Sequence, residues 1–131
     1  FILRSFTREE MDRLEDILEA ICVRVNKDFP NSKLEVIFKE QYRNMKEKLD
    51  EFPQVVDYAM EAVTRAGVTP IRTSIRGGTD GSRLSFMGLP CPNIFAGEHA
   101  FHSKQEWVSI QDMERAVDTI VHLAVIWEEK S

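Results

Sequence analysis

The chain has 131 residues, of which 43% are hydrophobic, so it can bury the core of one domain or of two small half-domains. Its net charge of −5 provides no basic surface of the kind that binds nucleic acid or an anionic membrane. No apolar run approaches the roughly 20 residues needed to span a bilayer, and no stretch has the pattern of a signal peptide. We therefore expect a cytoplasmic protein with neither nucleic acid nor membrane as a partner.

The first 45 residues predict a strand, a helix and a second strand. Residues 1–6 are short and apolar, and Thr7 and Glu10 form a capping box that predicts a helix start. The helix that follows carries an apolar stripe, which we expect to face the core, and it ends near Pro30. Residues 33–42 alternate between apolar and polar side chains, as a half-buried strand does. Strand, helix and strand in this order indicate a βαβ unit or part of a split βαβ sheet.

The next segment predicts a boundary followed by a second helix. Residues 44–51 are highly charged and read as a hinge. Pro53 stands at a favourable first helical position, and Gly67 is well placed to end the helix.

The remaining residues predict two more strands and a last helix. We expect strands at 69–75 and 93–96, a glycine-rich turn at 76–81, and an apolar stretch at 84–89 that is broken by Pro90 and Pro92. Ser109 is the expected N-cap of the last helix. The apolar stripe of that helix comprises Ile110, Met113, Val117, Ile120, Val121, Ala124 and Trp127. The predicted fold class is therefore α/β, with helices and strands mixed.

Two places in the second half could carry chemistry. Arg76 precedes Gly77 and Gly78, and a guanidinium beside free backbone amides is an arrangement that binds anions, although a Gly-Gly pair can also be a plain turn. His102 lies on a loop between charged residues, where it could ligate a metal, act as a base or simply be exposed. Cys22 and Cys91 are too few and too far apart for a disulfide framework or a cysteine zinc site. Taken alone, these residues do not complete an active site.

Three motifs carry a family resemblance. IRGGTDG at 75–81, LSFMGLPCPN at 84–93 and FHSKQE at 101–106 resemble the C-terminal part of the peptidase T family. This family is the tripeptide aminopeptidase branch of the di-zinc aminoacylase/carboxypeptidase superfamily. The resemblance runs from the segment with Arg4 to the last helix.

The resemblance implies two domain parts. Residues 1–45 correspond to the second half of a ferredoxin-like lid, or dimerisation, domain, and residues 46–131 to the C-terminal part of a zinc exopeptidase-like catalytic domain. A homodimer through the lid is a possible assembly of such enzymes.

The resemblance also implies roles for individual residues. Arg76 would hold the C-terminal carboxylate of a tripeptide, Gly77, Gly78 and Thr79 would lie beside the substrate backbone, and Arg4 would reach the substrate when the lid closes. His102 stands at the position of the last zinc ligand. The sequence departs from the family pattern at Ser5, Ser103 and Gln105, and none of these is the expected ligand.

The other expected groups of the family's active site belong upstream of Phe1. The chain begins without Met, so we expect it to be a fragment of a longer enzyme that binds two zinc ions. The fragment alone is expected to be inactive. Two alternatives remain: a non-catalytic dimerisation or binding module, and a related dipeptidase or deacylase.

Overall fold

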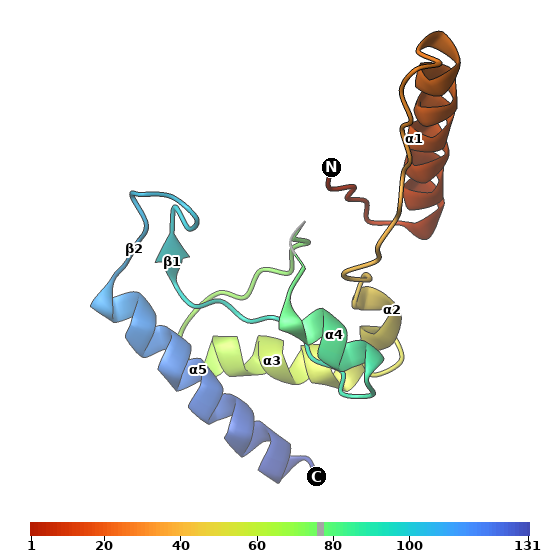
Figure 1. The fold of residues 1–131 in the computed structure, drawn as a ribbon. Helices are drawn as coiled ribbons and strands as arrows, with labels where there is room; N and C mark the ends of the chain where they lie inside the picture. The colour runs from red at the N-terminus through yellow and green to blue at the C-terminus, as the bar shows by residue number, and fades with distance from the viewer. Residues whose placement is uncertain (76–77) are drawn as a thin grey trace. The chain divides into compact units, whose positions relative to one another are not determined.

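The computed structural model describes residues 1–75 and 78–131, so Arg76 and Gly77 lie outside the described part. The described chain forms α1 (Arg8–Asp28), α2 (Lys46–Leu49), α3 (Pro53–Arg65), α4 (Asp80–Phe86), β1 (Glu98–His99), β2 (Trp107–Val108) and α5 (Ile110–Glu129), as Figure 1 shows. The two strands pair in an antiparallel sheet. Helices with this small sheet are compatible with the predicted mixed α/β class.

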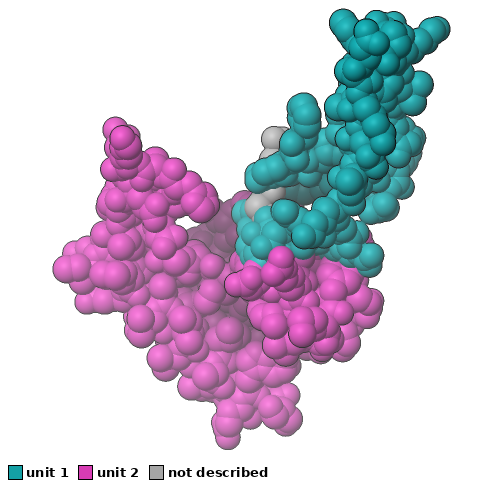
Figure 2. All heavy atoms as spheres, in the orientation of Figure 1, with its two compact units in different colours: residues 1–44, 75–79 teal, residues 45–74, 80–131 magenta. Residues whose placement is uncertain are grey.

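The chain divides into two compact units, coloured separately in Figure 2. Unit 1 comprises Phe1–Asn44 and Ile75–Thr79, and unit 2 comprises Met45–Ser74 and Asp80–Ser131. The division at Asn44–Met45 is next to the predicted boundary. That one part belongs to a lid and the other to a catalytic domain stays a prediction.

Unit 1 is built on α1, whose start is capped as its sequence predicts. The Thr7 side chain accepts a hydrogen bond from the backbone N–H of Glu10 at 3.3 Å. The returning half of the predicted capping box is different, because the Glu10 carboxylate accepts from the Ser5 hydroxyl at 2.5 Å, and that hydroxyl in turn accepts from the Thr7 N–H at 3.3 Å. The bond from the Glu10 N–H to Thr7 is therefore confirmed. The predicted bond from the Thr7 N–H to the Glu10 carboxylate is replaced by two bonds through the Ser5 hydroxyl.

After α1 the chain returns along the helix as an extended segment (Figure 1). The side-chain amide of Asn26 holds this segment by accepting from the N–H of Leu34 and donating to its carbonyl, both at 2.7 Å. These two bonds satisfy the backbone of Leu34 much as a neighbouring strand would.

The predictions of strands at 1–6 and 33–42 are wrong for this structure, as is the prediction that the α1 stripe is buried. Both segments are described, and neither pairs with a strand. A strand needs a neighbour to take its N–H and C=O groups, and the described residues supply none here. Likewise, α1 has no buried residue.

The core of unit 2 lies between α3 and α5, which pack against each other. On α3 the buried residues are small, namely Ala59, Ala62 and Val63, and on α5 Thr119 and Ile126 are fully buried. Small side chains on one helix let the other approach closely. At the end of the contact, the rings of Tyr58 and Trp127 meet edge to face with centroids 4.9 Å apart.

A charged network joins the same two helices at the surface. Arg65 contacts Glu61 at 2.6 Å and Glu129 at 2.8 Å, and the Lys130 ammonium contacts Glu61 at 2.5 Å. The hydrogen bonds from Lys130 and then Arg65 lower the pKa of Glu61, and the bond from Arg65 lowers the pKa of Glu129. Because Arg65, Glu129 and Lys130 are exposed and Glu61 is only half-buried, the network adds little stability.

The helix-end signals of unit 2 are confirmed. Pro53 occupies the first turn of α3, and Gly67, with φ +76°, ends it in a Schellman motif in which Val68 N–H donates to Val63 C=O at 3.1 Å. The Arg115 guanidinium adds a bond of 3.0 Å to the carbonyl of Ala66.

The remaining predictions for unit 2 need correction. Residues 69–75 and 93–96 form no strand within the described chain, and part of the predicted turn and apolar stretch is the helix α4. The apolar stripe predicted for the last helix is exposed: Ile110, Met113, Val117, Ile120, Val121, Ala124 and Trp127 all lie at the surface. The helix instead buries Thr119 and Ile126, on a different side. No helix in the described residues is long and apolar enough to cross a membrane.

Candidate functional site

His102 lies on a loop that the short β1–β2 hairpin presents above the start of α5 (Figure 1). In the hairpin, Glu98 faces Val108 and His99 faces Trp107, so residues 100–106 form the connecting loop. His102, the predicted metal ligand, therefore lies in the loop that connects the two paired strands.

The backbone of the loop is ordered by its own side chains. The N–H of His102 donates to a Glu106 carboxylate oxygen at 2.9 Å, and the Ser103 hydroxyl donates to the carbonyl of Ala100 at 2.6 Å. Ala100 and His102 adopt left-handed conformations with φ of 50° and 64°, which are uncommon for residues other than glycine. The His102 ring is exposed and lies edge to face with Phe101, with 5.5 Å between centroids.

His102 does not make a metal site with other described residues. Throughout residues 1–75 and 78–131, no group of three or more His, Cys, Asp and Glu side chains is arranged to hold a metal ion. Zinc in proteins takes three or four protein ligands, so the described residues alone do not fit the ion. An exposed imidazole on an ordered loop provides at most one ligand.

The base of the loop contains an interaction that the sequence did not reveal. The His99 ring stacks on Trp107 with centroids 4.2 Å apart and 14° between the planes, and its Nε2 lies 3.4 Å from Oδ2 of Asp112. The Ser109 hydroxyl donates to the same Asp112 oxygen at 2.7 Å. The bond from Ser109, followed by the contact with His99, lowers the pKa of Asp112 against the opposing effect of burial.

The predicted anion-binding turn is described only in part. Arg76 and Gly77, two of the predicted substrate-binding residues, lie outside the described residues. Gly78 packs on Tyr42 so closely that an added Cβ would lie 2.1 Å from the ring. The position therefore requires glycine for a packing reason, whether or not it lies beside a substrate. Thr79 is half-buried.

The other predicted residues fall in separate parts of the chain. Arg4 is exposed in unit 1, which also contains Gly78 and Thr79, whereas His102 belongs to unit 2.

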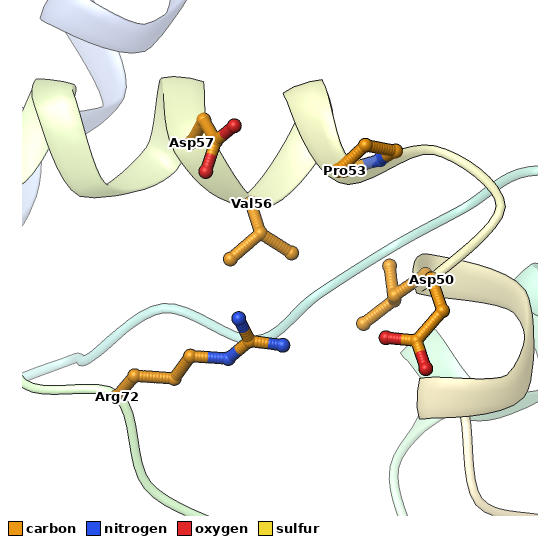
Figure 3. Close-up of a pocket in the computed structure, with 6 residues that line it drawn as sticks. Asp50, Pro53, Val56, Asp57 and Arg72 are labelled. Carbon is orange, nitrogen blue, oxygen red and sulfur yellow. The ribbon is translucent and has the colours of Figure 1, made fainter.

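A surface pocket of unit 2 involves none of the predicted site residues. It has a volume of about 190 Å³ and is lined by Leu49, Asp50, Pro53, Val56, Asp57 and Arg72. Figure 3 shows the Arg72 guanidinium below Val56, with the Asp50 carboxylate to its right and Asp57 above Val56 on α3. Asp50 is paired with Lys46. The pocket combines an apolar wall with charges of both signs, and it contains no nucleophile with an adjacent base.

Comparison with known proteins gives matches along nearly the whole chain. Over 130 residues, or 99% of the chain, it is 43% identical to a protein named peptidase T from Shewanella sediminis (strain HAW-EB3). It is 42% identical to peptidase T from Clostridium perfringens and 41% identical to peptidase T from Clostridium botulinum over the same length. The chain spans 32% of the length of these relatives. No family model matches the chain.

Proposed function

This chain is homologous to peptidase T over nearly its whole length, and we propose that it is the C-terminal part of a zinc-dependent tripeptide aminopeptidase. Such an enzyme would release the N-terminal residue of tripeptides. The observation that carries the proposal is the identity of 41–43% across 99% of the chain to proteins of that name. The three motifs that suggested the family from the sequence lie within this match.

In this proposal the residues of the chain bind and orient the substrate. Arg76 would pair with the C-terminal carboxylate, Gly77, Gly78 and Thr79 would line the substrate backbone, and Arg4 would approach when the lid closes. A guanidinium suits this role because its planar fork matches a carboxylate. Of these residues, Gly78 packs tightly on Tyr42, which supports a fixed place for its backbone.

His102 would supply one ligand to a pair of zinc ions. Its exposed ring, on a loop ordered through Glu106 and Ser103, supports this assignment. The remaining ligands and the general base would lie in the rest of the longer enzyme. The 131-residue chain by itself would therefore bind no zinc pair and hydrolyse no peptide. We place the enzyme in the cytoplasm.

A non-catalytic association module is the second candidate, and one observation favours it. The apolar stripe of α5 is exposed, and large exposed apolar patches mark interaction sites. A homodimer through the lid domain would be a further assembly of this type. A related dipeptidase or deacylase differs from the main proposal only in its substrate.

Hydrolysis by the protein of the complete reading frame separates these candidates. The panel contains tripeptides, dipeptides and acyl amino acids, and the 131-residue chain is assayed beside the complete protein. Release of the N-terminal residue from tripeptides by the complete protein alone supports the proposal. Hydrolysis of acyl amino acids or dipeptides but not tripeptides points to the related enzyme, and a folded complete protein without activity points to the module.

A further inference from the structure

The hairpin below His102 is too small to be stable by pairing alone. Each strand has two residues, and even a full two-stranded hairpin is only marginally stable in water. Something else must hold residues 100–106 in the conformation that the structure shows.

The additional contacts run from α5 through β1 to β2. Asp112 is fixed in the first turn of α5, where its N–H donates to the Ser109 hydroxyl at 3.0 Å and its carboxylate accepts from the same hydroxyl. Gly97 lies directly against it, since a Cβ at that position would be 2.4 Å from the Asp112 Cβ. His99 then faces Asp112 with its Nε2 and covers Trp107 with its ring plane.

We propose that His99 is a positioning residue, and that the clasp formed by His99, Trp107 and Asp112 sets the conformation of the 100–106 loop. His99 touches both other members: its edge meets the carboxylate of Asp112 and its face meets the indole of Trp107. His99 precedes the 100–106 loop and Trp107 follows it, so the contact of His99 with Asp112 links both ends of the loop to α5. The consequence for His102 rests on the proposed function, in which that ring is a zinc ligand.

The backbone segment from His99 to His102 is short, and its conformation is restricted. Only Ala100 and Phe101 lie between them, and Ala100 and His102 itself are in the left-handed region. Such conformations persist only when the surroundings enforce them. Loss of the anchor at His99 should therefore release the loop and break the bond from the His102 N–H to Glu106.

Amide hydrogen exchange on the 131-residue chain tests the clasp directly. His99→Ala removes both contacts, His99→Phe keeps the stacking, and His99→Gln keeps a donor toward Asp112. Glu98→Ala is the matched control, because Glu98 is the exposed neighbour on the same strand.

The amide exchange rate at His102 should differ between the three His99 variants. Loss of an aromatic pair and a polar contact should speed exchange at the His102 amide about tenfold in His99→Ala, with smaller changes in His99→Phe and His99→Gln. The amides of α3 and α5 should be unaffected, which shows that the variants remain folded. Unchanged exchange at His102 in His99→Ala, or equal acceleration in Glu98→Ala, would overturn the proposal.

A second measurement addresses the role in the active site. In the complete protein, His99→Ala should lower kcat for a tripeptide and leave KM nearly unchanged, because the loop carries no substrate-binding group in the proposed function. Unaltered kcat despite a loosened loop would refute the positioning role. Failure of the wild-type protein to cleave any tripeptide would refute the proposed function instead, and the exchange experiment would still decide whether the clasp exists.

Discussion

Replacement of Ile126 by alanine should destabilise unit 2 more than the same replacement at the surface of α5. Ile126 is fully buried in the core between α3 and α5. The change removes three carbons, worth about 0.8 kcal/mol each, or ~2.4 kcal/mol in transfer free energy, and the cavity adds about 1 kcal/mol or more. We therefore expect a loss of ~3–4 kcal/mol in the free energy of unfolding.

Urea unfolding followed by circular dichroism measures this loss. With a slope of about 1.5 kcal/mol per molar urea, the midpoint should fall by roughly 2 M. Ile120→Ala is the control, since Ile120 lies on the same helix with 56% of its surface exposed. It should cost less than about 1 kcal/mol because little burial is lost and no cavity forms. Equal destabilisation by the two variants would show that the side of Ile120 contributes as much as the side of Ile126, and the account of the core would be wrong.

Three further outcomes follow from local geometry and charge. Gly97→Ala should cost more than Gly88→Ala in urea unfolding, about 2–4 against ~1 kcal/mol, since both glycines have positive φ but only Gly97 abuts another residue; similar costs would contradict the described packing of Gly97. Thr7→Ala should reduce the stability of α1 by about 1 kcal/mol through loss of the cap, seen as lower helix content on heating, and no change would show that the Ser5–Glu10 pair suffices. The folded-state pKa of Asp112 lies below its ordinary 3.8, so its contribution to stability is present above that value and is lost as the pH falls through the folded pKa. Ser109→Ala should raise the pKa of Asp112 in an NMR titration, and an unmoved pKa would refute the role given to the hydroxyl.

The parts of the fold that sequence could predict are those that depend on a few adjacent residues. The caps of α1 and α5 and the ends of α3 are such features, because a side chain at Thr7, Pro53, Gly67 or Ser109 acts on backbone groups within one turn. Each was read correctly from its immediate neighbours. The resemblance to peptidase T is also confirmed, since the matches to proteins of that name cover 99% of the chain.

The parts that failed depend on residues distant in sequence. Alternation at 33–42 shows that the segment could be a strand, but a strand forms only beside a partner, and Asn26 takes the backbone of Leu34 instead. Helical spacing located the apolar stripe of α5 but did not identify the side that meets α3, where the fully buried Thr119 bonds back to the Arg115 carbonyl at 2.8 Å.

The candidate site shows the same limit. His102 lies in a motif, whereas no motif singles out His99, which is exposed in the structure as well. Its partner Asp112 is thirteen positions away and on another element, so no local pattern links them. An aromatic residue facing a histidine across a predicted hairpin could have indicated the stack, but the hairpin itself was not predicted.

Tripeptide hydrolysis by the protein of the complete reading frame, with and without His102→Ala, tests the central claim most directly. The account predicts release of the N-terminal residue by the wild-type protein and loss of that activity in the folded variant, together with a lower zinc content. The 131-residue chain should show no activity. Full activity in His102→Ala, or hydrolysis by the 131-residue chain alone, would contradict the account.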